Sequence, residues 1–264
     1  MKLKPIEYIG PAPAVKRPRK SAGGWLLIVF AAALAILLAR PFVQLVQAQQ
    51  SEPNATTLEA AGKQLDQIGS FGAKLAKAAL ARTEADVTYD LSYWNIEAPD
   101  VDIPADRGKA EDVIVRSYRA VGTDLRMMIN DDMSENFREY PRYWGLSEPD
   151  PNVDHRRTPN LQRFFVRHGE SLGTSNTAED YEFGDIVVWH LPEQQLQRGG
   201  HIGIVVPGPG KLSEEKWIVH NNGSGPRWEN ELFSYPIIGH YRYVPKSLLV
   251  DLESEVMGPF QHSF

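Results

Sequence analysis

The order of patterns along the 264 residues predicts an α+β fold, with helices first and a small antiparallel sheet after them. Apolar side chains recur at helical spacing within residues 58–168, whereas short β-branched runs separated by Gly- and Pro-rich turns dominate residues 185–244. This segregation is typical of the α+β class, because a parallel sheet needs strands and helices in alternation. Hydrophobic residues make up 42% of the chain, which is enough for a packed core and excludes disorder of the whole chain.

The N-terminus differs from the rest of the chain in charge and hydropathy. Residues 1–24 carry six basic side chains against one acidic side chain, a local net charge of +5 in a chain whose formal net charge is −6. Residues 25–39 then contain no polar side chain. This run rises only about 22 Å as a helix, so spanning a hydrocarbon core of about 30 Å needs a snorkelling Arg40 and the apolar residues up to Val46.

This pattern predicts a basic cytoplasmic tail at 1–24 and a transmembrane anchor at 25–46. Basic residues ahead of an apolar run hold the N-terminus in the cytoplasm, so we expect a single pass through the inner membrane with the bulk of the chain in the periplasm. The alternative is a signal peptide cleaved at the small-residue site Val46-Gln47-Ala48, which would release the chain into the periplasm. A buried core helix is a third interpretation, disfavoured because nothing amphipathic flanks the run.

The helical half follows this segment. Residues 47–86 are predicted as a polar linker and a stalk helix, or alternatively as the first helix of the domain. A loop rich in Pro, Asp and Gly follows at 94–108, and Asp106 is a candidate cap for the next helix. Helices are then expected from about Lys109, over 124–134 and over 161–168.

The strand half begins near residue 185. Strands are predicted at 185–189, 202–206, 217–219 and 241–244. We therefore place the folded domain at 87–244, followed by a C-terminal tail at 245–264.

Composition removes several classes of function. The chain contains no cysteine, which excludes disulfides, cysteine-ligated zinc, iron–sulfur clusters and a thiol nucleophile. Its overall acidity argues against a nucleic-acid partner. The run 207–211 lacks the spacing of a phosphate-binding loop, and no glutamate follows the Asp pairs at calcium-loop spacing. No motif predicts a cofactor or a resident metal.

Two groups of residues remain as candidates for chemistry. His201 opens one predicted strand and His220 closes the next, so both imidazoles are expected at the same end of the sheet if these strands pair. Each could also be an ordinary polar strand terminus. The run Asp154-His155-Arg156-Arg157 is either a salt-bridged lock of its loop or a fork of guanidinium donors for carboxylates of a ligand.

Short motifs in a fixed order extend from about Val87 to Tyr243. They are Ile103-Pro104-Ala105-Asp106-Arg107-Gly108, Glu111-Asp112-Val113, Tyr140-Pro141, Trp144-Gly145-Leu146, Asp154-His155-Arg156-Arg157, Pro159-Asn160-Leu161-Gln162, Gly184-Asp185-Ile186-Val187, His201-Ile202-Gly203-Ile204-Val205, Val219-His220-Asn221, Tyr235-Pro236-Ile237 and Gly239-His240-Tyr241-Arg242-Tyr243. Together they resemble the bacterial domain-of-unknown-function family 1287, the YijF-like proteins. That family is similar to papain-like cysteine hydrolases of the NlpC and CHAP kind, which cut or trim peptidoglycan peptides.

The resemblance implies a papain-like domain with roles for particular residues. His201 matches the strand-borne base, His220 or Asn221 matches the residue that orients it, and Asp112 matches the acid two places after the nucleophile. The nucleophile itself is missing, because Ala110 stands where the family pattern has cysteine.

Three hypotheses follow from this vacancy. The first is a catalytically silent, membrane-anchored protein that binds peptidoglycan or its stem peptides, with Asp154, His155, Arg156, Arg157, Trp144 and Asn221 as candidate substrate-binding residues. The second is an active hydrolase or amidase in which His201 activates water with Glu111 or Asp112, or in which a metal lies between His201 and His220. The third is an engineered Cys→Ala change, which the unusual neighbours Lys109 and Glu111 disfavour.

Overall fold

The computed structural model describes residue 10 and residues 28–31, 53–96, 101–191, 200–210 and 213–246. The predicted tail and anchor lie almost entirely outside these ranges, as does the C-terminal tail from residue 247 onward. Among the described residues, no helix has both the length and the apolar character needed to cross a membrane.

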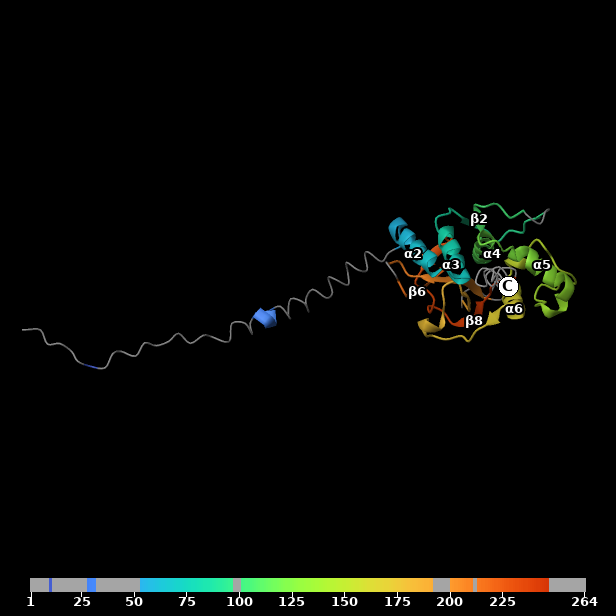
Figure 1. Cartoon of the computed structure of the whole chain (residues 1–264). Coiled ribbons are helices and arrows are strands. Elements are labelled where there is room, and N and C mark those ends of the chain that lie inside the picture. The colour runs from blue at the N-terminus through green and yellow to red at the C-terminus, as the bar shows by residue number, and fades with distance from the viewer. Residues whose placement is uncertain are drawn as a thin grey trace, which may run out of the picture. The chain divides into compact units, whose positions relative to one another are not determined.

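The chain folds into a mixed structure of helices and one main antiparallel sheet, as the order of sequence patterns predicts. The α-helices are α2 (Ala55–Ile68), α3 (Phe71–Arg82), α4 (Ala110–Ala120), α5 (Leu125–Asn136) and α6 (Thr158–His168). Short 3-10 helices are η1 (Phe137–Glu139), η2 (Asp154–Arg156) and η3 (Ala178–Asp180). The helices α2 to α5 follow one another along one side of the sheet (Figure 1).

The main sheet has the order β3-β8-β4-β5-β6-β7, and every neighbouring pair is antiparallel. Its strands are β3 (Glu170–Ser171), β4 (Ile186–Trp189), β5 (His201–Pro207), β6 (Lys216–His220), β7 (Arg227–Glu229) and β8 (Ile237–Arg242). A second, parallel pair joins β1 (Thr88–Tyr89) to β2 (Arg107–Gly108), directly ahead of α4. The predicted strand at 241–244 is present but begins earlier, at Ile237, while β3 and β7 are too short to have a strand pattern of their own.

The two faces of the sheet bury different side chains, because successive residues of a strand point to opposite faces. Ile186 and Val188 share one apolar cluster with the helices, whereas Val187 and Trp189 share a second cluster with Tyr181. The helix-side cluster is the larger, and α3 and α4 both pack against β5.

Helices α2 and α3 belong to this core. Leu65 of α2 and Leu75 of α3 are each 1% exposed and lie in the same cluster as α4 and the sheet. Of the two interpretations of residues 47–86, the packing favours the first helices of the domain over a stalk. The pattern is two helices because Gly69 ends α2 in the left-handed conformation (φ 69°) and Ser70 caps α3, its hydroxyl accepting from the Ala73 N–H at 3.1 Å.

The start of α4 differs from the predicted cap. Lys109, not Asp106, is the cap residue, and Asp106 is exposed. The carboxylate of Asp112 accepts the Lys109 N–H at 2.7 Å, so the cap is supplied from inside the first turn of the helix.

A contact between two glycines docks α3 on the sheet. A Cβ on Gly72 of α3 would lie 2.4 Å from the carbonyl oxygen of Phe183, and a Cβ on Gly184 would lie 2.3 Å from that of Gly72. Gly184 also has φ 93°, and its N–H donates to Val205 of β5 at 2.8 Å. The helix therefore meets the turn before β4 backbone to backbone.

This contact generates a matched pair of substitutions. Gly72→Ala is expected to lower the free energy of unfolding by about 1–3 kcal/mol, because the methyl group forces α3 away from the turn. In Gly62→Ala of α2, the new Cβ meets only Lys77 Cε at 3.7 Å. That variant is expected to gain about 0.5–1 kcal/mol from helix propensity. Urea unfolding of the full chain, followed by tryptophan fluorescence, measures both; a gain in Gly72→Ala would contradict the docking contact.

Candidate functional site

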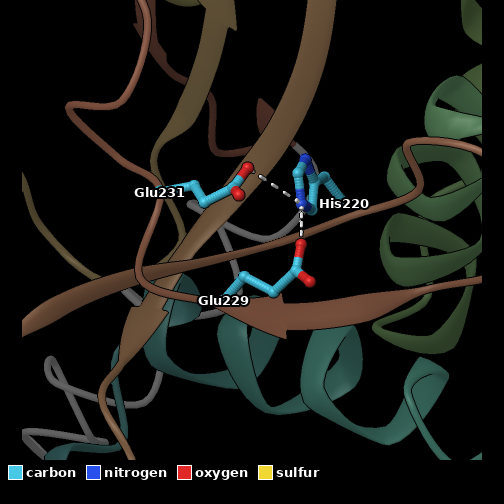
Figure 2. A group of neighbouring side chains, drawn as sticks. All are labelled: His220, Glu229 and Glu231. Atoms are coloured by element: carbon cyan, nitrogen blue, oxygen red, sulfur yellow. Dashed lines mark hydrogen bonds and ion pairs between the residues drawn. The ribbon is translucent and has the colours of Figure 1, made fainter.

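Two histidines and a glutamate form a hydrogen-bonded chain at one end of the sheet. The register that pairs Ile204 with Val219 brings the first residue of β5 close to the last residue of β6. His201 Nε2 and His220 Nδ1 are 2.7 Å apart, and His220 Nε2 is 2.7 Å from Glu229 Oε2 (Figure 2 shows the second contact). His201 and His220 are 5% and 2% exposed. The two imidazoles expected at one end of the sheet are thus brought together.

The carboxylate of Glu229 determines which atoms donate and which accept in this chain of hydrogen bonds. The hydrogen bond from His220 holds the pKa of Glu229 below its ordinary value, so the carboxylate is ionised and can only accept. With His220 as a neutral imidazole, its Nε2 donates to Glu229 and its Nδ1 accepts the proton of His201 Nε2. The other nitrogen of His201, Nδ1, retains its lone pair. Burial, and next the neighbouring His220, lower the pKa of His201 to about 4, which makes this lone pair available at neutral pH.

Glu229 is the site residue that the sequence patterns do not predict. The turn at 221–225 is recognisable from its Asn and Gly residues, but the returning strand β7 covers only Arg227–Glu229. If a β-hairpin had been predicted from the sequence across this turn, it would have placed the carboxylate of Glu229 beside His220.

The start of α4 carries the vacant position. Ala110 is the first residue of the helix and is 4% exposed, within the helix-side apolar cluster. The neighbouring Glu111 accepts from the Thr158 hydroxyl at 2.8 Å and lies 3.2 Å from Lys109 Nζ. Burial raises the pKa of Glu111, but Lys109 and the hydrogen bonds outweigh it, so the pKa lies below its ordinary value.

The charge of Glu111 raises the pKa of His201, but the lowering effects of burial and of His220 are larger. Asn221, which follows His220, donates to the Gly108 carbonyl at 3.2 Å and so ties the end of β6 to the residues before α4. The pairing register assigns His201 to the face of the sheet that carries Trp189, opposite the helices. The contact of Asn221 with Gly108 therefore connects the end of β6 that carries His220 to the segment before Ala110.

Asp112 and Arg156 form a buried ion pair. Arg156 Nε and Nη2 lie 2.9 and 3.0 Å from the two carboxylate oxygens of Asp112, and both side chains are at most 4% exposed. The remaining donors of Arg156 bond the carbonyls of Ser92 and Asp90, each at 2.9 Å. Asp112 thus clamps the helix start, and four of the five N–H groups of Arg156 are engaged within the protein.

The rest of the charged run is also held within the protein. Arg157 donates to Asp154 at 2.6 Å, and burial lowers the pKa of the enclosed His155 to about 3. For Asp154, His155 and Arg156 the structure therefore favours a role in holding their own loop together over a role in binding the carboxylates of a ligand. Arg157 differs, because its guanidinium lies 4.0 Å from the ring centroid of the half-buried Trp144.

A metal ion between His201 and His220 would require the two rings to move apart and break the hydrogen bond between them. Ligand atoms of a tetrahedral zinc ion lie about 3.4 Å apart when each bond is about 2.1 Å. The facing nitrogens here are 2.7 Å apart and share a hydrogen bond.

Comparison with known proteins adds family information. Residues 76–243 match the family model described as "Domain of unknown function (DUF1287)". The chain is 40% identical over 158 residues to "Uncharacterized protein YijF" of Escherichia coli (strain K12), covering 60% of this chain and 75% of that protein. It is also similar to the solved structures of NlpC2 and NlpC1 from Trichomonas vaginalis, with 18% and 16% identity over 66% and 65% of this chain and TM-scores of 0.36. The chain spans less than half the length of those two, 47% and 45%.

The buried ion pair generates a prediction about stability. Asp112→Asn leaves the Arg156 charge buried without its counter-ion, so we expect the free energy of unfolding to fall by about 3–5 kcal/mol. The matched control is Asp66→Asn, which breaks an exposed pair with Lys77 at 2.6 Å. Its loss is expected to stay below about 1 kcal/mol. Equal losses in urea unfolding of the two variants would show that Asp112 does not clamp α4.

Proposed function

The chain belongs to the DUF1287 family, as its motifs predict, and from this premise we propose that it binds peptidoglycan peptides at the membrane surface without cleaving them. The observation that carries the proposal is the methyl group of Ala110 at the N-terminus of α4 in a protein without cysteine, together with the hydrogen-bonded chain of His201, His220 and Glu229. The relation to NlpC-like hydrolases, in which this position would hold the nucleophile, is part of the proposal.

Loss of the nucleophile removes most of the activity of such a site. Removing the attacking residue of a hydrolytic triad lowers the rate by about 10⁴ to 10⁶, while the groups that bind substrate remain. His201 retains a neutral, basic nitrogen that can accept a hydrogen bond from a peptide N–H. The site can therefore still recognise a peptide.

An exposed aromatic surface supports recognition beside the vacant position. Arg157 lies over Trp144, and the next residue, Thr158, bonds Glu111, the neighbour of Ala110. The adjacent Tyr143 is 52% exposed. Aromatic rings with a guanidinium provide apolar contact together with a partner for carboxylates, which is the chemistry of a stem peptide.

The second candidate is a hydrolase in which His201 activates water, and the lone pair on Nδ1 favours it. The carboxylates that would assist are already engaged, because Glu111 is held by Lys109 and Thr158 and Asp112 by Arg156. A base alone, without a positioned nucleophile or an assisting acid, supports binding better than catalysis.

The location of the protein is part of the same proposal. The basic residues 1–24 followed by the apolar residues 25–39 are the signature of an N-terminal membrane anchor that places the domain in the periplasm, next to the cell wall. Cleavage after residue 48 would yield a soluble periplasmic form with the same binding domain.

Sedimentation with purified peptidoglycan tests this function. The full chain, kept in detergent, is expected to sediment with the polymer and to release no soluble fragments. Trp144→Ala should reduce the bound fraction several-fold, while Phe233→Ala, which alters an aromatic ring 41% exposed beyond β7, should not. Fragment release that His201→Ala abolishes would establish the hydrolase instead, and absence of both binding and release would exclude the cell-wall role.

A single introduced thiol tests whether His201 still addresses the vacant position. Ala110→Cys is expected to give a thiol pKa below the ordinary value of about 8.5, because the helix N-terminus and the nearby imidazole favour the thiolate. Ala120→Cys, at the exposed opposite end of the same helix, is the control and should have a pKa at or above that value. The pH dependence of alkylation by iodoacetamide measures both.

The Ala110→Cys thiol is free of interference because the chain has no other cysteine. Ala110→Cys with His201→Gln should return the thiol pKa toward that of the control. A pKa in Ala110→Cys equal to or above that of Ala120→Cys would mean that the histidine chain does not serve position 110.

A further inference from the structure

At the Glu229 end of the hydrogen-bonded chain, three side chains of the types that bind metal ions lie close together. His220 Nε2, a carboxylate oxygen of Glu229 and one of Glu231 all lie within 4.8 Å of one another. Figure 2 shows the two carboxylates directed toward the same nitrogen, from the end of β7 and from the turn that follows it. Imidazole nitrogen and carboxylate oxygen are the mixed ligand set of zinc-type divalent ions.

The charges of this cluster are unbalanced. One N–H of His220 serves Glu229 at 2.7 Å, whereas Glu231 lies 3.9 Å away and receives no hydrogen bond from it. Within the described ranges of the chain, no lysine or arginine lies within 4.0 Å of either carboxylate. Two carboxylates thus face one imidazole, an arrangement that a cation would neutralise.

The supporting residues hold the three groups in place. His220 ends β6 and Glu229 ends β7, and these strands are paired. Glu231 precedes the buried Leu232, whose carbonyl accepts from the Trp189 indole N–H at 2.8 Å. Tetrahedral ligands lie about 3.4 Å apart. The nitrogen-to-oxygen distances of 2.7 and 3.9 Å bracket this value, so small side-chain movements would complete the site.

We propose that His220, Glu229 and Glu231 bind a zinc-type divalent metal ion through His220 Nε2 and one oxygen of each carboxylate. A histidine that ligates through one nitrogen usually donates the proton of the other to a neighbouring acceptor. His201 Nε2, 2.7 Å from His220 Nδ1, is that acceptor. The carboxylates also line a pocket of about 770 Å³, together with Trp217, Trp228 and Glu84, through which an ion and its water can enter.

Metal binding would reverse the hydrogen bond between the histidines. Without metal and with both imidazoles neutral, the proton of His220 is on Nε2 and His201 donates. With metal on Nε2, the proton of His220 moves to Nδ1 and His201 accepts, so the proton of His201 moves to Nδ1. The lone pair that faces away from His220 is then lost. The bound ion and a basic His201 Nδ1 therefore exclude each other, and this holds whether or not the chain binds peptidoglycan.

Calorimetric titration with Zn²⁺ tests the site in the full chain, prepared without an affinity tag and dialysed against a chelator. We expect one ion per chain. Glu231→Gln is the informative variant, because Glu231 makes no hydrogen bond to His220 and its loss leaves the metal-free fold intact. Its affinity should fall at least about tenfold, whereas Glu84→Gln, in the same pocket but outside the cluster, should retain the affinity of the unchanged chain.

Two further measurements make the outcome unambiguous. Zn²⁺ should raise the thermal midpoint of the unchanged chain and of Glu84→Gln but not of Glu231→Gln, while the metal-free midpoints of all three coincide. Nitrogen NMR of the histidine rings should show His201 Nδ1 changing from an unprotonated to a protonated nitrogen when Zn²⁺ is added. Failure of the unchanged chain to bind, or equal binding by Glu231→Gln, would overturn the site.

Discussion

The buried pair of Asp112 and Arg156 is the interaction on which the candidate site depends. Burying two charges costs several kcal/mol each, and only complete hydrogen bonding offsets that cost. Here Arg156 bonds both oxygens of Asp112 and the carbonyls of Asp90 and Ser92, and Asp112 also receives the Lys109 N–H. One guanidinium thus joins η2, the segment after β1 and the first turn of α4. The orientation of Ala110 follows from that junction.

The buried polar groups of the hydrogen-bonded chain of His201, His220 and Glu229 also have hydrogen-bond partners. In contrast to the ion pair, its hydrogen bonds run in one donor-to-acceptor order. A carboxylate at one end accepts only, so with both imidazoles neutral each has one tautomer, and the unprotonated nitrogen is Nδ1 of His201 at the other end. Two imidazoles alone would have no such preference. Glu229 therefore contributes as much to the character of the site as either histidine, although it lies at the edge of the sheet and is half-buried.

The sequence predicts those parts of the structure that local pattern determines. Helices α4 to α6 and the four longer strands follow from periodicity, and the meeting of His201 with His220 follows from their places at strand ends. The partner of Asp112 lies 44 residues away, and no local pattern selects Arg156 from its arginine-rich neighbourhood. The same side chains serve equally well as a lock or as a ligand fork, and only burial decides between them. The inclusion of α2 and α3 in the core likewise depends on the backbone contact of Gly72 with Gly184, which composition does not reveal.

The side chain of Ala110 is packed against its neighbours, although the cysteine of the family pattern is missing there. Its methyl group is 4% exposed within the apolar cluster of α4 and the sheet, so the vacant position is filled rather than hollow. On one side Lys109 pairs with Glu111 at 3.2 Å, and Glu111 in turn receives Thr158. The contacts of Lys109 and Glu111 thus join the residues on both sides of Ala110 to one another and to α6, which supports the proposal of a binding protein over that of a hydrolase altered at a single residue.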